Sequence, residues 1–337
     1  MHLGFVYDLQ GELARDKQTV PDAEAELASP YEIQDLIANL ESLGHTVTPI
    51  GDFERLLRFI AGGYTVDLVF NYAVGKHGPV REAQVPALLE ALRIPYTGAD
   101  PFSLALCMDK AAVKRLWREA GLPTTDFVIL RRVEELATVS LPPWPLFVKP
   151  VREGSSKGIS AHSRVENDRQ LREQVAYVLS TYQQPALVEP YLPGPEFSAG
   201  VVGSHHTAHP LGVVEILQSR LGYADYHDKQ QWQDERFRPV KPPEFRAGLC
   251  SLALQAYQGV YCEGIGRVDI RLDQNRQPML MEINPNPVLH AHDSSMSAIA
   301  NQAGLSNVDL LASVIEMAVQ RWKNAPGGSV LTDPAGP

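Results

Sequence analysis

Residues 147–160, FVKPVREGSSKGIS, join a short apolar run to a loop rich in glycine and serine. The apolar run predicts a buried strand that ends in Lys149. Glycine lets backbone N–H groups come close to an anion, and serine hydroxyls add further donors. Lys149, Arg152 and Lys157 outnumber Glu153 here, so this window is cationic inside a chain whose net charge is −10. The segment therefore predicts a strand followed by an anion-binding loop.

The composition of this loop also invites three interpretations other than anion binding: a hairpin, a Walker A loop and the nucleophile turn of a serine hydrolase. A hairpin with solvated charges stays open. A Walker A loop is excluded, because G-x-x-x-x-G-K-[ST] does not occur in the chain. Residues 154–158 match the G-x-S-x-G of serine hydrolases, with Ser156 as nucleophile and Asp269 and His290 following in chain order. That motif needs a helix directly after the loop, whereas residues 159–162 predict another strand, so a hydrolase is disfavoured.

Two more apolar strands are predicted at residues 266–272, GRVDIRL, and 278–284, PMLMEIN, joined by the short connection 273–277. Side chains of a strand alternate between its two faces. The polar residues of both strands should therefore share one face if the strands pair. These residues are Arg267, Asp269, Glu282 and Asn284.

Two carboxylates and an amide on one face predict a magnesium site, since magnesium binds carboxylate oxygens and bridges them to phosphates. A buried ion pair, Arg267 with Asp269 or Glu282, is the alternative. The anion-binding loop upstream favours the magnesium interpretation.

The chain has 337 residues, of which 44% are hydrophobic and 21% charged, as in ordinary globular proteins. This length predicts two or three compact units. The acidic balance argues against a general nucleic-acid binder, and no apolar run reaches the ~20 residues of a membrane span. Three widely spaced cysteines do not form a disulfide framework, which favours a cytoplasmic protein.

The first third predicts strands alternating with helices, and hence a parallel sheet. Strands are expected at residues 3–8, 47–50 and 66–70. A helix should begin after Ser29, because Ser29 as N-cap, Pro30 at the first position and Glu32 make a capping box. Helical spacing also covers 81–92. The polar, unpatterned residues 10–28 predict a mobile loop that acts as a lid.

The later two-thirds predict a mixed α+β arrangement with antiparallel strands. Helices are expected at residues 104–120, 166–181, 244–260 and 308–323. Further short strands are expected at residues 127–130, 146–148, 186–189, 197–202 and 213–217. The tail 326–337 is rich in glycine and proline and predicts disorder.

Several motifs resemble those of D-alanine–D-alanine ligases and follow one another in that family's order. They are PYTG at residues 95–98, MDK at 108–110, VKP at 148–150, REGSS at 152–156, VE at 188–189, GPEF at 194–197, GRVD at 266–269 and EIN at 282–284. The similarity extends from residue 86 to residue 287. It implies the ATP-grasp fold, α/β and α+β in content, behind an N-terminal Rossmann-like domain with a parallel sheet. The implied divisions are an N-terminal domain 1–103, a central subdomain 104–190, a C-terminal subdomain 191–325 and the tail 326–337.

The resemblance also implies an ATP- and magnesium-dependent ligase that forms a C–N bond. A substrate carboxylate would attack the γ-phosphoryl group to give an acyl phosphate, and an amine would then displace phosphate.

The resemblance also implies roles for individual residues. Lys110, Lys149 and Lys229 would hold the ATP phosphates. The phosphate loop would comprise Glu153, Gly154, Ser155, Ser156, Lys157 and Gly158. Glu189, Pro190, Tyr191 and Leu192 would border the adenine, and Glu196 would meet the ribose. Asp269, Glu282 and Asn284 would hold two magnesium ions, which manganese could replace. The catalytic side chains would be Arg267, which stabilises the tetrahedral oxyanion, together with Ser156 and Lys229.

The amino-acid side departs from the family pattern. The Ser-x-Glu-x-x-x-Ser turn expected after the first strand is replaced by YDLQGE at residues 7–12, and the expected His-Gly by NYAVGKHG at 71–78. The tyrosine expected after Lys229 is Gln230, and the expected Pro-Gly turn reads PV at 287–288. We therefore expect a donor or acceptor other than D-alanine, for example serine or threonine joined to a mycosporine-type acid.

Two alternative functions are compatible with these motifs: a genuine D-alanine–D-alanine ligase, and a non-catalytic nucleotide sensor. The sensor is disfavoured because no metal ligand of the pattern is missing. The stretch HAHD at 290–293 could suggest a metal site, but alternating loop histidines favour a polar surface or a substrate pocket. The expected partners are ATP, an amino acid and a second carboxylic acid, with neither nucleic acid nor membrane. The resemblance implies a homodimer.

Overall fold

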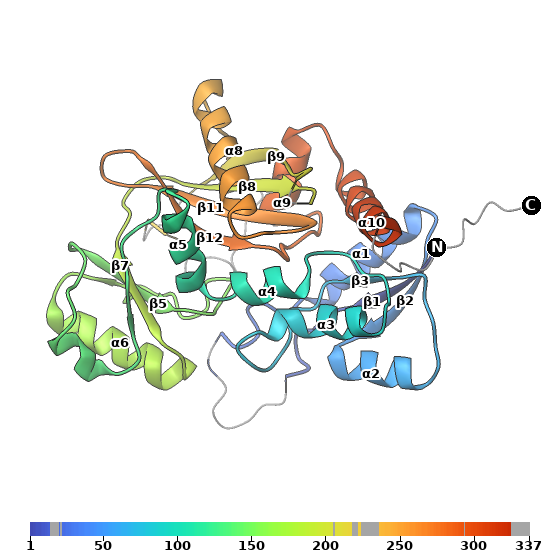
Figure 1. The fold of residues 1–337 in the computed structure, drawn as a ribbon, viewed down its shortest axis with the longest axis horizontal. Helices are drawn as coiled ribbons and strands as arrows, with labels where there is room; N and C mark the ends of the chain where they lie inside the picture. Colours follow the sequence, from blue (N-terminus) through green and yellow to red (C-terminus); the bar gives the residue numbers. More distant parts are fainter. Residues whose placement is uncertain are drawn as a thin grey trace, which may run out of the picture.

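The computed structural model describes residues 1–13, 20, 22–204, 206–217, 222–223, 236–292 and 294–324. The described residues form three sheets that lie along the long axis of the molecule (Figure 1). Lys229, Gln230, Asp293 and the tail predicted to be disordered lie outside the described residues. No described helix is long and apolar enough to cross a membrane.

The N-terminal sheet is parallel, as predicted, with strand order β2-β1-β3. Its strands are β1 (His2–Val6), β2 (Thr46–Gly51) and β3 (Leu68–Asn71), and its helices are α1 (Pro30–Ser42), α2 (Phe53–Ala61), η1 (Arg81–Ala83) and α3 (Gln84–Ala91). Helix α2 was not predicted; Asp52 caps it by accepting a hydrogen bond from the Arg55 amide. Strand β3 is buried throughout, as a parallel strand covered on both faces requires.

The second sheet is antiparallel, with order β4-β7-β5-β6, and helix α6 packs on it at one end of the molecule (Figure 1). Its elements are β4 (Val128–Leu130), η2 (Val133–Ala137), β5 (Leu146–Pro150), β6 (Arg164–Val165), α6 (Asp168–Tyr182) and β7 (Ala186–Pro190). The strand predicted at 159–162 is wrong. A serine turn occupies these residues, since Ser160 and Ser163 exchange hydrogen bonds there.

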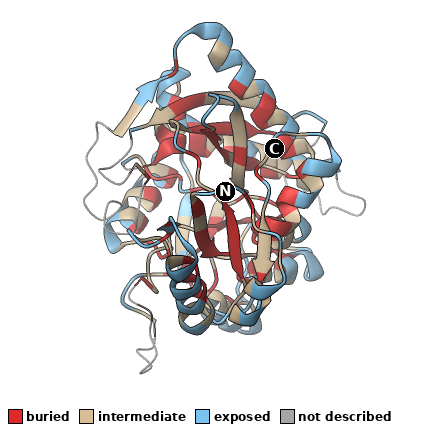
Figure 2. Ribbon diagram, turned by 90° about the vertical axis from the view of Figure 1, so that its left-hand side faces the viewer, coloured by how far each residue is buried: buried red, intermediate tan, exposed pale blue. Residues whose placement is uncertain are grey.

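The third sheet has five strands in the order β10-β9-β8-β11-β12 and lies between the other two (Figure 1). Its elements are β8 (Glu196–Val202), β9 (His209–Ile216), β10 (Phe237–Pro239), α8 (Pro243–Gln258), β11 (Ile265–Leu272), β12 (Pro278–Asn284), α9 (Ser295–Gln302) and α10 (Asn307–Asn324). Helix α8 covers one face and α9, which was not predicted, covers the other. The central strands are buried and the outer helices exposed (Figure 2).

The single helix predicted at 104–120 is wrong: the chain forms α4 (Pro101–Cys107) and α5 (Lys110–Glu119). Asp109 separates them, because its backbone is extended and its carboxylate accepts from the Ala112 amide at 3.0 Å. As a result Lys110 is the first residue of α5 and turns toward β12, where it meets Glu282. The domain boundary predicted at residues 103 and 104 falls inside α4; the division into domains stays a prediction.

The capping box predicted at the start of α1 is confirmed. The Ser29 hydroxyl accepts from the Glu32 amide at 3.2 Å, and the Glu32 carboxylate accepts from the Ser29 amide at 3.3 Å. Pro30 takes the first helical position, where a missing N–H has no cost.

We expect Ser29→Ala to lower the free energy of unfolding by about 1 kcal/mol, because the Glu32 amide loses its acceptor, the Ser29 hydroxyl. Urea denaturation measures it. The control is Ser42→Ala at the exposed end of the same helix, which should change the free energy by less than about 0.5 kcal/mol. Equal effects of the two substitutions would contradict the capping role.

Candidate functional site

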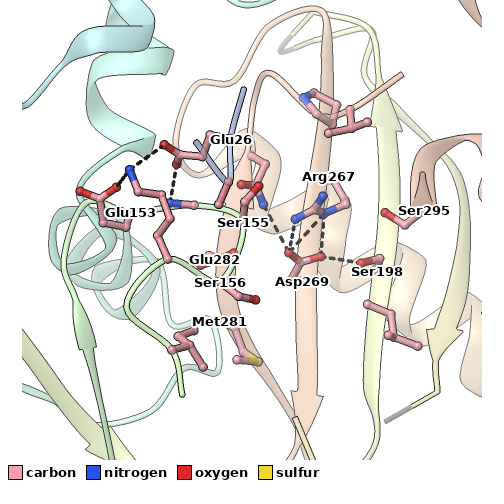
Figure 3. A pocket seen from close by; sticks show the side chains of 18 of the residues that line it. Glu26, Glu153, Ser155, Ser156, Ser198, Arg267, Asp269, Met281, Glu282 and Ser295 are labelled. Atoms are coloured by element: carbon pink, nitrogen blue, oxygen red, sulfur yellow. Dashed lines mark hydrogen bonds and ion pairs between the residues drawn. The ribbon is translucent and has the colours of Figure 1, made fainter. Parts of the chain in front are cut away.

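A cavity of about 360 Å³ is lined by strands of the second and third sheets and by loop and helix residues of the N-terminal unit (Figure 3). One wall is the loop after β5, which carries Ser155 and Ser156. A second wall is the face of β11 and β12. The third wall comes from the N-terminal unit, through residues 25–27, Glu32 and Glu82. Residues far apart in the sequence therefore share one enclosed space.

Strands β11 and β12 pair, and their polar residues share one face, as the alternation predicts. Arg267 lies opposite Asn284, and Asp269 lies opposite Glu282. All four side chains line the cavity. The ion-pair alternative is also correct, because Arg267 holds Asp269 through two nitrogens, Nε to Oδ1 at 2.9 Å and Nη2 to Oδ2 at 2.8 Å. Arg267 Nη1 has no hydrogen-bond partner within the part of the chain that the structure describes.

Glu282 and Asp269 are held by different cations on the same face. Lys110 Nζ lies 3.2 Å from Glu282, while Asp269 accepts from Ser198 at 2.6 Å and from Asn284 at 3.3 Å. Burial acts to raise the pKa of the Glu282 carboxyl, but Lys110, Lys149 and Arg267 hold it well below its ordinary value. Glu282 is therefore an anion at neutral pH.

The donor set of this face fits a magnesium ion. Two carboxylates and one amide supply hard oxygen ligands, and magnesium keeps several waters or phosphate oxygens besides its protein ligands. Among the described residues no three His, Cys, Asp or Glu side chains form a metal-binding group.

Lys149, the penultimate residue of β5, is 3% exposed and lies beside a buried acid. Its Nζ lies 2.7 Å from Glu189, which also meets Lys114 at 2.9 Å and Thr125 at 2.5 Å. Burial acts to raise the pKa of the Glu189 carboxyl, but Lys114 and Lys149 hold this pKa far below its ordinary value. The Glu189 side chain thus fixes Lys149 at the cavity wall. Glu189, Pro190, Tyr191 and Leu192 are not among the residues that line the cavity, whereas Glu196 is.

The glycine- and serine-rich loop has a tight tip with two residues in the left-handed region. Ser155 has φ 47° and Ser156 has φ 59°, and the Lys157 amide donates to the Gly154 carbonyl at 2.9 Å. Such φ values cost a non-glycine residue about 1–2 kcal/mol each. Both serine side chains line the cavity. Gly158 is required, because its φ is 76° and a Cβ there would lie 2.5 Å from Pro150 Cγ.

Two carboxylates of the N-terminal unit hold the ends of this loop, and we call this contact the latch (Asp22 and Glu26 on Gly154 and Gly158). The Gly154 amide donates to Glu26 at 2.7 Å, and the Gly158 amide donates to Asp22 at 2.7 Å. Tyr182, the last residue of α6, also donates to Asp22 at 2.8 Å. The described end of the segment predicted to be a lid therefore lies on the loop.

Glu26 belongs to a buried cluster of four charges. Arg81 lies 2.7 Å from Glu26 and 3.3 Å from Glu153, and Lys157 lies 2.7 Å from Glu153 and 3.4 Å from Glu26 (Figure 3 shows the two acids). Burial acts to raise the pKa of the Glu26 carboxyl, but Arg81 and Lys157 hold this pKa below its ordinary value. Lys157 is therefore restrained by carboxylates.

Glu82 is the exception among these acids. It lines the cavity, and it makes no hydrogen bond or ion pair with any residue that the structure describes. Burial, with a further contribution from Glu26, raises the pKa of Glu82 to about 7 against the pull of Arg81 and Lys110. No sequence pattern distinguished Asp22, Glu26 or Glu82, because their neighbours come from distant segments.

The family model for the C-terminal part of D-alanine–D-alanine ligases matches residues 116–316. The chain belongs to the D-alanine–D-alanine ligase family. A D-alanine–D-alanine ligase of Bordetella petrii is 32% identical over 78% of this chain and 78% of its own length. An uncharacterised protein of Sinorhizobium fredii is 32% identical over 85% of this chain and 87% of its own length.

Solved structures of family members share the fold. The D-alanine–D-alanine ligase of Bacillus anthracis in complex with ATP superposes with a TM-score of 0.72 at 21% identity, covering 95% of this chain and 98% of that one. The enzyme of Coxiella burnetii gives the same TM-score and covers 94% of its own chain. The predicted ATP-grasp fold with an N-terminal parallel-sheet domain is confirmed. As a family member the chain is an ATP-grasp ligase that forms a C–N bond with ADP as product.

We expect Glu26→Gln to loosen the loop, because the latch loses a charge-assisted hydrogen bond of about 1.5–3 kcal/mol. Trypsin cleavage after Lys157 in the absence of nucleotide should become roughly 10- to 100-fold faster. Glu24→Gln is the matched control, since Glu24 accepts from the Gly11 amide and does not touch the loop. Unchanged cleavage in Glu26→Gln would show that the latch does not order the loop.

We expect Glu82→Gln to stabilise the protein more at pH 8 than at pH 5. An acid whose pKa is raised by folding to about 7 binds its proton more tightly in the folded state, so its ionisation removes stability as pH rises from about 4.5 through 7. The gain at pH 8 should exceed that at pH 5 by about 2 kcal/mol in urea denaturation of the nucleotide-free protein. Glu54→Gln on the exposed face of α2 should show no such difference. Equal gains at both pH values would contradict the raised pKa.

Proposed function

We propose that this protein is an ATP- and magnesium-dependent ligase that joins an amino acid to another small carboxylic acid through an acyl phosphate. One observation carries the proposal: the glycine- and serine-rich loop, Lys110, Lys149 and the polar face of β11 and β12 all open onto one cavity. The N-terminal unit forms the third wall of that cavity. This wall includes Gln10 and Val74, which belong to the two stretches, 7–12 and 71–78, that differ from the family pattern.

The nucleotide occupies the end of the cavity between the second and third sheets. Lys110, Lys149 and the loop Glu153–Gly154–Ser155–Ser156–Lys157–Gly158 hold the phosphates. Phe147, Ile159 and Met281 supply apolar lining that suits a purine. Glu189 and Pro190 at the end of β7, with Tyr191 and Leu192 directly after it, would border the adenine from behind the residues that line the cavity, and Glu196 would meet the ribose. Lys229 would add a further cation from a segment outside the described residues.

Asp269, Glu282 and Asn284 would hold two magnesium ions, or manganese in their place. Bound there, the metal supplies positive charge beside the transferring phosphoryl group. Lys110 contacts Glu282 directly, so this lysine both orients a metal ligand and faces the phosphates. Ser156 lines the same space and orients the reacting carboxylate.

The reaction has two steps. A carboxylate oxygen of the first substrate attacks the γ-phosphorus, the bond to the β-phosphate oxygen breaks, and ADP leaves behind an acyl phosphate. The amine of the second substrate then attacks the acyl carbon, and phosphate departs with the C–O bonding electrons while the nitrogen loses a proton to solvent. Arg267 Nη1, which has no hydrogen-bond partner among the described residues, would donate to the oxyanion, a contact that typically contributes 10²–10³-fold in rate.

The substrates are the part that the family leaves open. The replaced N-terminal turn and the changed stretch 71–78 favour an amino acid other than D-alanine, such as serine or threonine joined to a mycosporine-type acid. The D-alanine–D-alanine ligase reaction is the second candidate, favoured by the names of relatives such as the Bordetella petrii enzyme. Both candidates use the same nucleotide end, and we propose that the active form is a homodimer.

ADP release from purified protein with Mg-ATP tests the proposal. The amino acids are D-alanine, L-serine, L-threonine and glycine, each with and without a mycosporine-type acid. Release that requires a second acid would establish a hetero-ligase, whereas release with D-alanine alone would establish the second candidate.

We expect Asp269→Asn to reduce ADP release by more than about 100-fold, because one carboxylate of the phosphate-facing site loses its charge. Asp273→Asn in the exposed β11–β12 turn is the control and should retain activity. Nucleotide binding by the wild type without ADP release under any of these conditions would favour the non-catalytic sensor instead.

A further inference from the structure

A polar corner of the cavity lies in the N-terminal wall and is not used by the nucleotide or the metal ligands. It consists of Glu32 on the first turn of α1, Tyr72 directly after β3, and His290 after β12. Tyr72 donates its hydroxyl to Glu32 Oε1 at 2.6 Å, and His290 Nε2 lies 3.8 Å from the same oxygen. Glu32 and His290 both line the cavity. Three distant segments therefore converge on one carboxylate.

The hydrogen bonds of His290 determine what it offers to a ligand. Its Nδ1 accepts from the His292 amide at 3.2 Å. A neutral imidazole that accepts at Nδ1 carries its proton on Nε2. The Nε2–H group then lies 3.8 Å from Glu32 Oε1, which is too long for a hydrogen bond between them, and both side chains line the cavity. The corner thus presents one donor and one acceptor next to each other.

Glu32 has acceptor capacity left. It accepts from the Ser29 amide and the Tyr72 hydroxyl, while a carboxylate offers about four acceptor positions. Within the described residues no lysine or arginine pairs with it, and its side chain is only 15% exposed. A buried carboxylate with so few partners favours a further donor from a ligand.

We propose that Glu32 and His290 recognise a hydroxyl group on the side chain of the amino-acid substrate. The inference rests on the proposed ligase function and names its substrate class, a hydroxyl-bearing amino acid. The ligand hydroxyl accepts from His290 Nε2–H and donates to Glu32, and Tyr72 holds Glu32 in place. Glu32 and His290 are specificity residues here and take no part in the chemical steps.

Other ligand groups match this corner less well. A methyl group would leave the donor and the acceptor both unpaired, which is how a polar site rejects an analogue that lacks its hydroxyl. An ammonium group could donate to Glu32 but offers nothing to the N–H of His290. A carboxylate could accept from His290 but is repelled by Glu32. Only a group that both donates and accepts satisfies the two together.

Calorimetric titration with magnesium and a non-hydrolysable ATP analogue tests the proposal without needing the second acid. Serine is compared with alanine, and threonine with 2-aminobutyrate, each as both enantiomers. Within each pair only the hydroxyl differs. We expect one enantiomer series of the wild-type protein to favour the hydroxyl member by about tenfold or more.

Variants connect this preference to the corner. Glu32→Gln removes the charge but keeps an acceptor and remains compatible with the capping box, so the fold is retained. It should reduce the hydroxyl preference about five- to tenfold, and His290→Ala should reduce it as well. His292→Ala is the matched control, because its exposed ring does not line the cavity; it should keep the wild-type preference.

The outcomes separate this inference from the proposed function. Equal binding within each pair, no binding of any hydroxyl-bearing member, or a preference unchanged in both Glu32→Gln and His290→Ala would each overturn the recognition of a hydroxyl. ADP release with alanine would then still support the ligase. Conversely, a hydroxyl preference lost in Glu32→Gln supports the recognition even where ADP release fails.

Discussion

The antiparallel pairing of β11 with β12 is the constraint on which the site depends. The period-two alternation of a strand sends Val268 and Ile283 into the core and Asp269 and Glu282 into the cavity. A slip of one residue would reverse every side chain, exposing the apolar set and burying the acids. The hydrophobic core thus enforces the arrangement of the polar face. Apolar packing on the core side is therefore enough to direct these polar side chains into the cavity.

Around that face the protein keeps many charges out of water, and it does so by pairing them. Glu189 has two lysines, Glu26 has an arginine and a lysine, and Asp269 has Arg267. A buried charge without a partner is costly, and each described cation proposed to face the phosphates already has an anionic neighbour. These pairs keep the nucleotide end formed before any nucleotide arrives. Binding a polyanion therefore exchanges ionic partners instead of creating new charge in the interior.

Much of this arrangement could be predicted from the sequence. The capping box of α1 and the shared face of Asp269 and Glu282 follow from local spacing, which a single strand or helix start determines. The break between α4 and α5 was missed because helical spacing runs across Asp109, and only its side-chain cap interrupts the helix. Asp22 and Glu26 could not be assigned roles, because the loop glycines that they hold lie more than a hundred residues away. For Glu32 the sequence predicted the capping box but not its contacts with Tyr72 and His290, which come from distant segments. Spacing along one element carries information about that element alone.

The latch has a consequence for how members of this family can diverge. Residues 25–27 line the cavity on the side proposed for the amino acid, while Asp22 and Glu26 hold the ends of the loop proposed to bind the phosphates. Because residues 22–27 make both sets of contacts, their sequence is more constrained than that of an ordinary surface loop. Lengthening it or changing its polarity to suit a new substrate also shifts the glycines that it holds. Change of substrate is therefore coupled to compensating change in the loop after β5, and pairs of substitutions across these two segments are the expected record of that history.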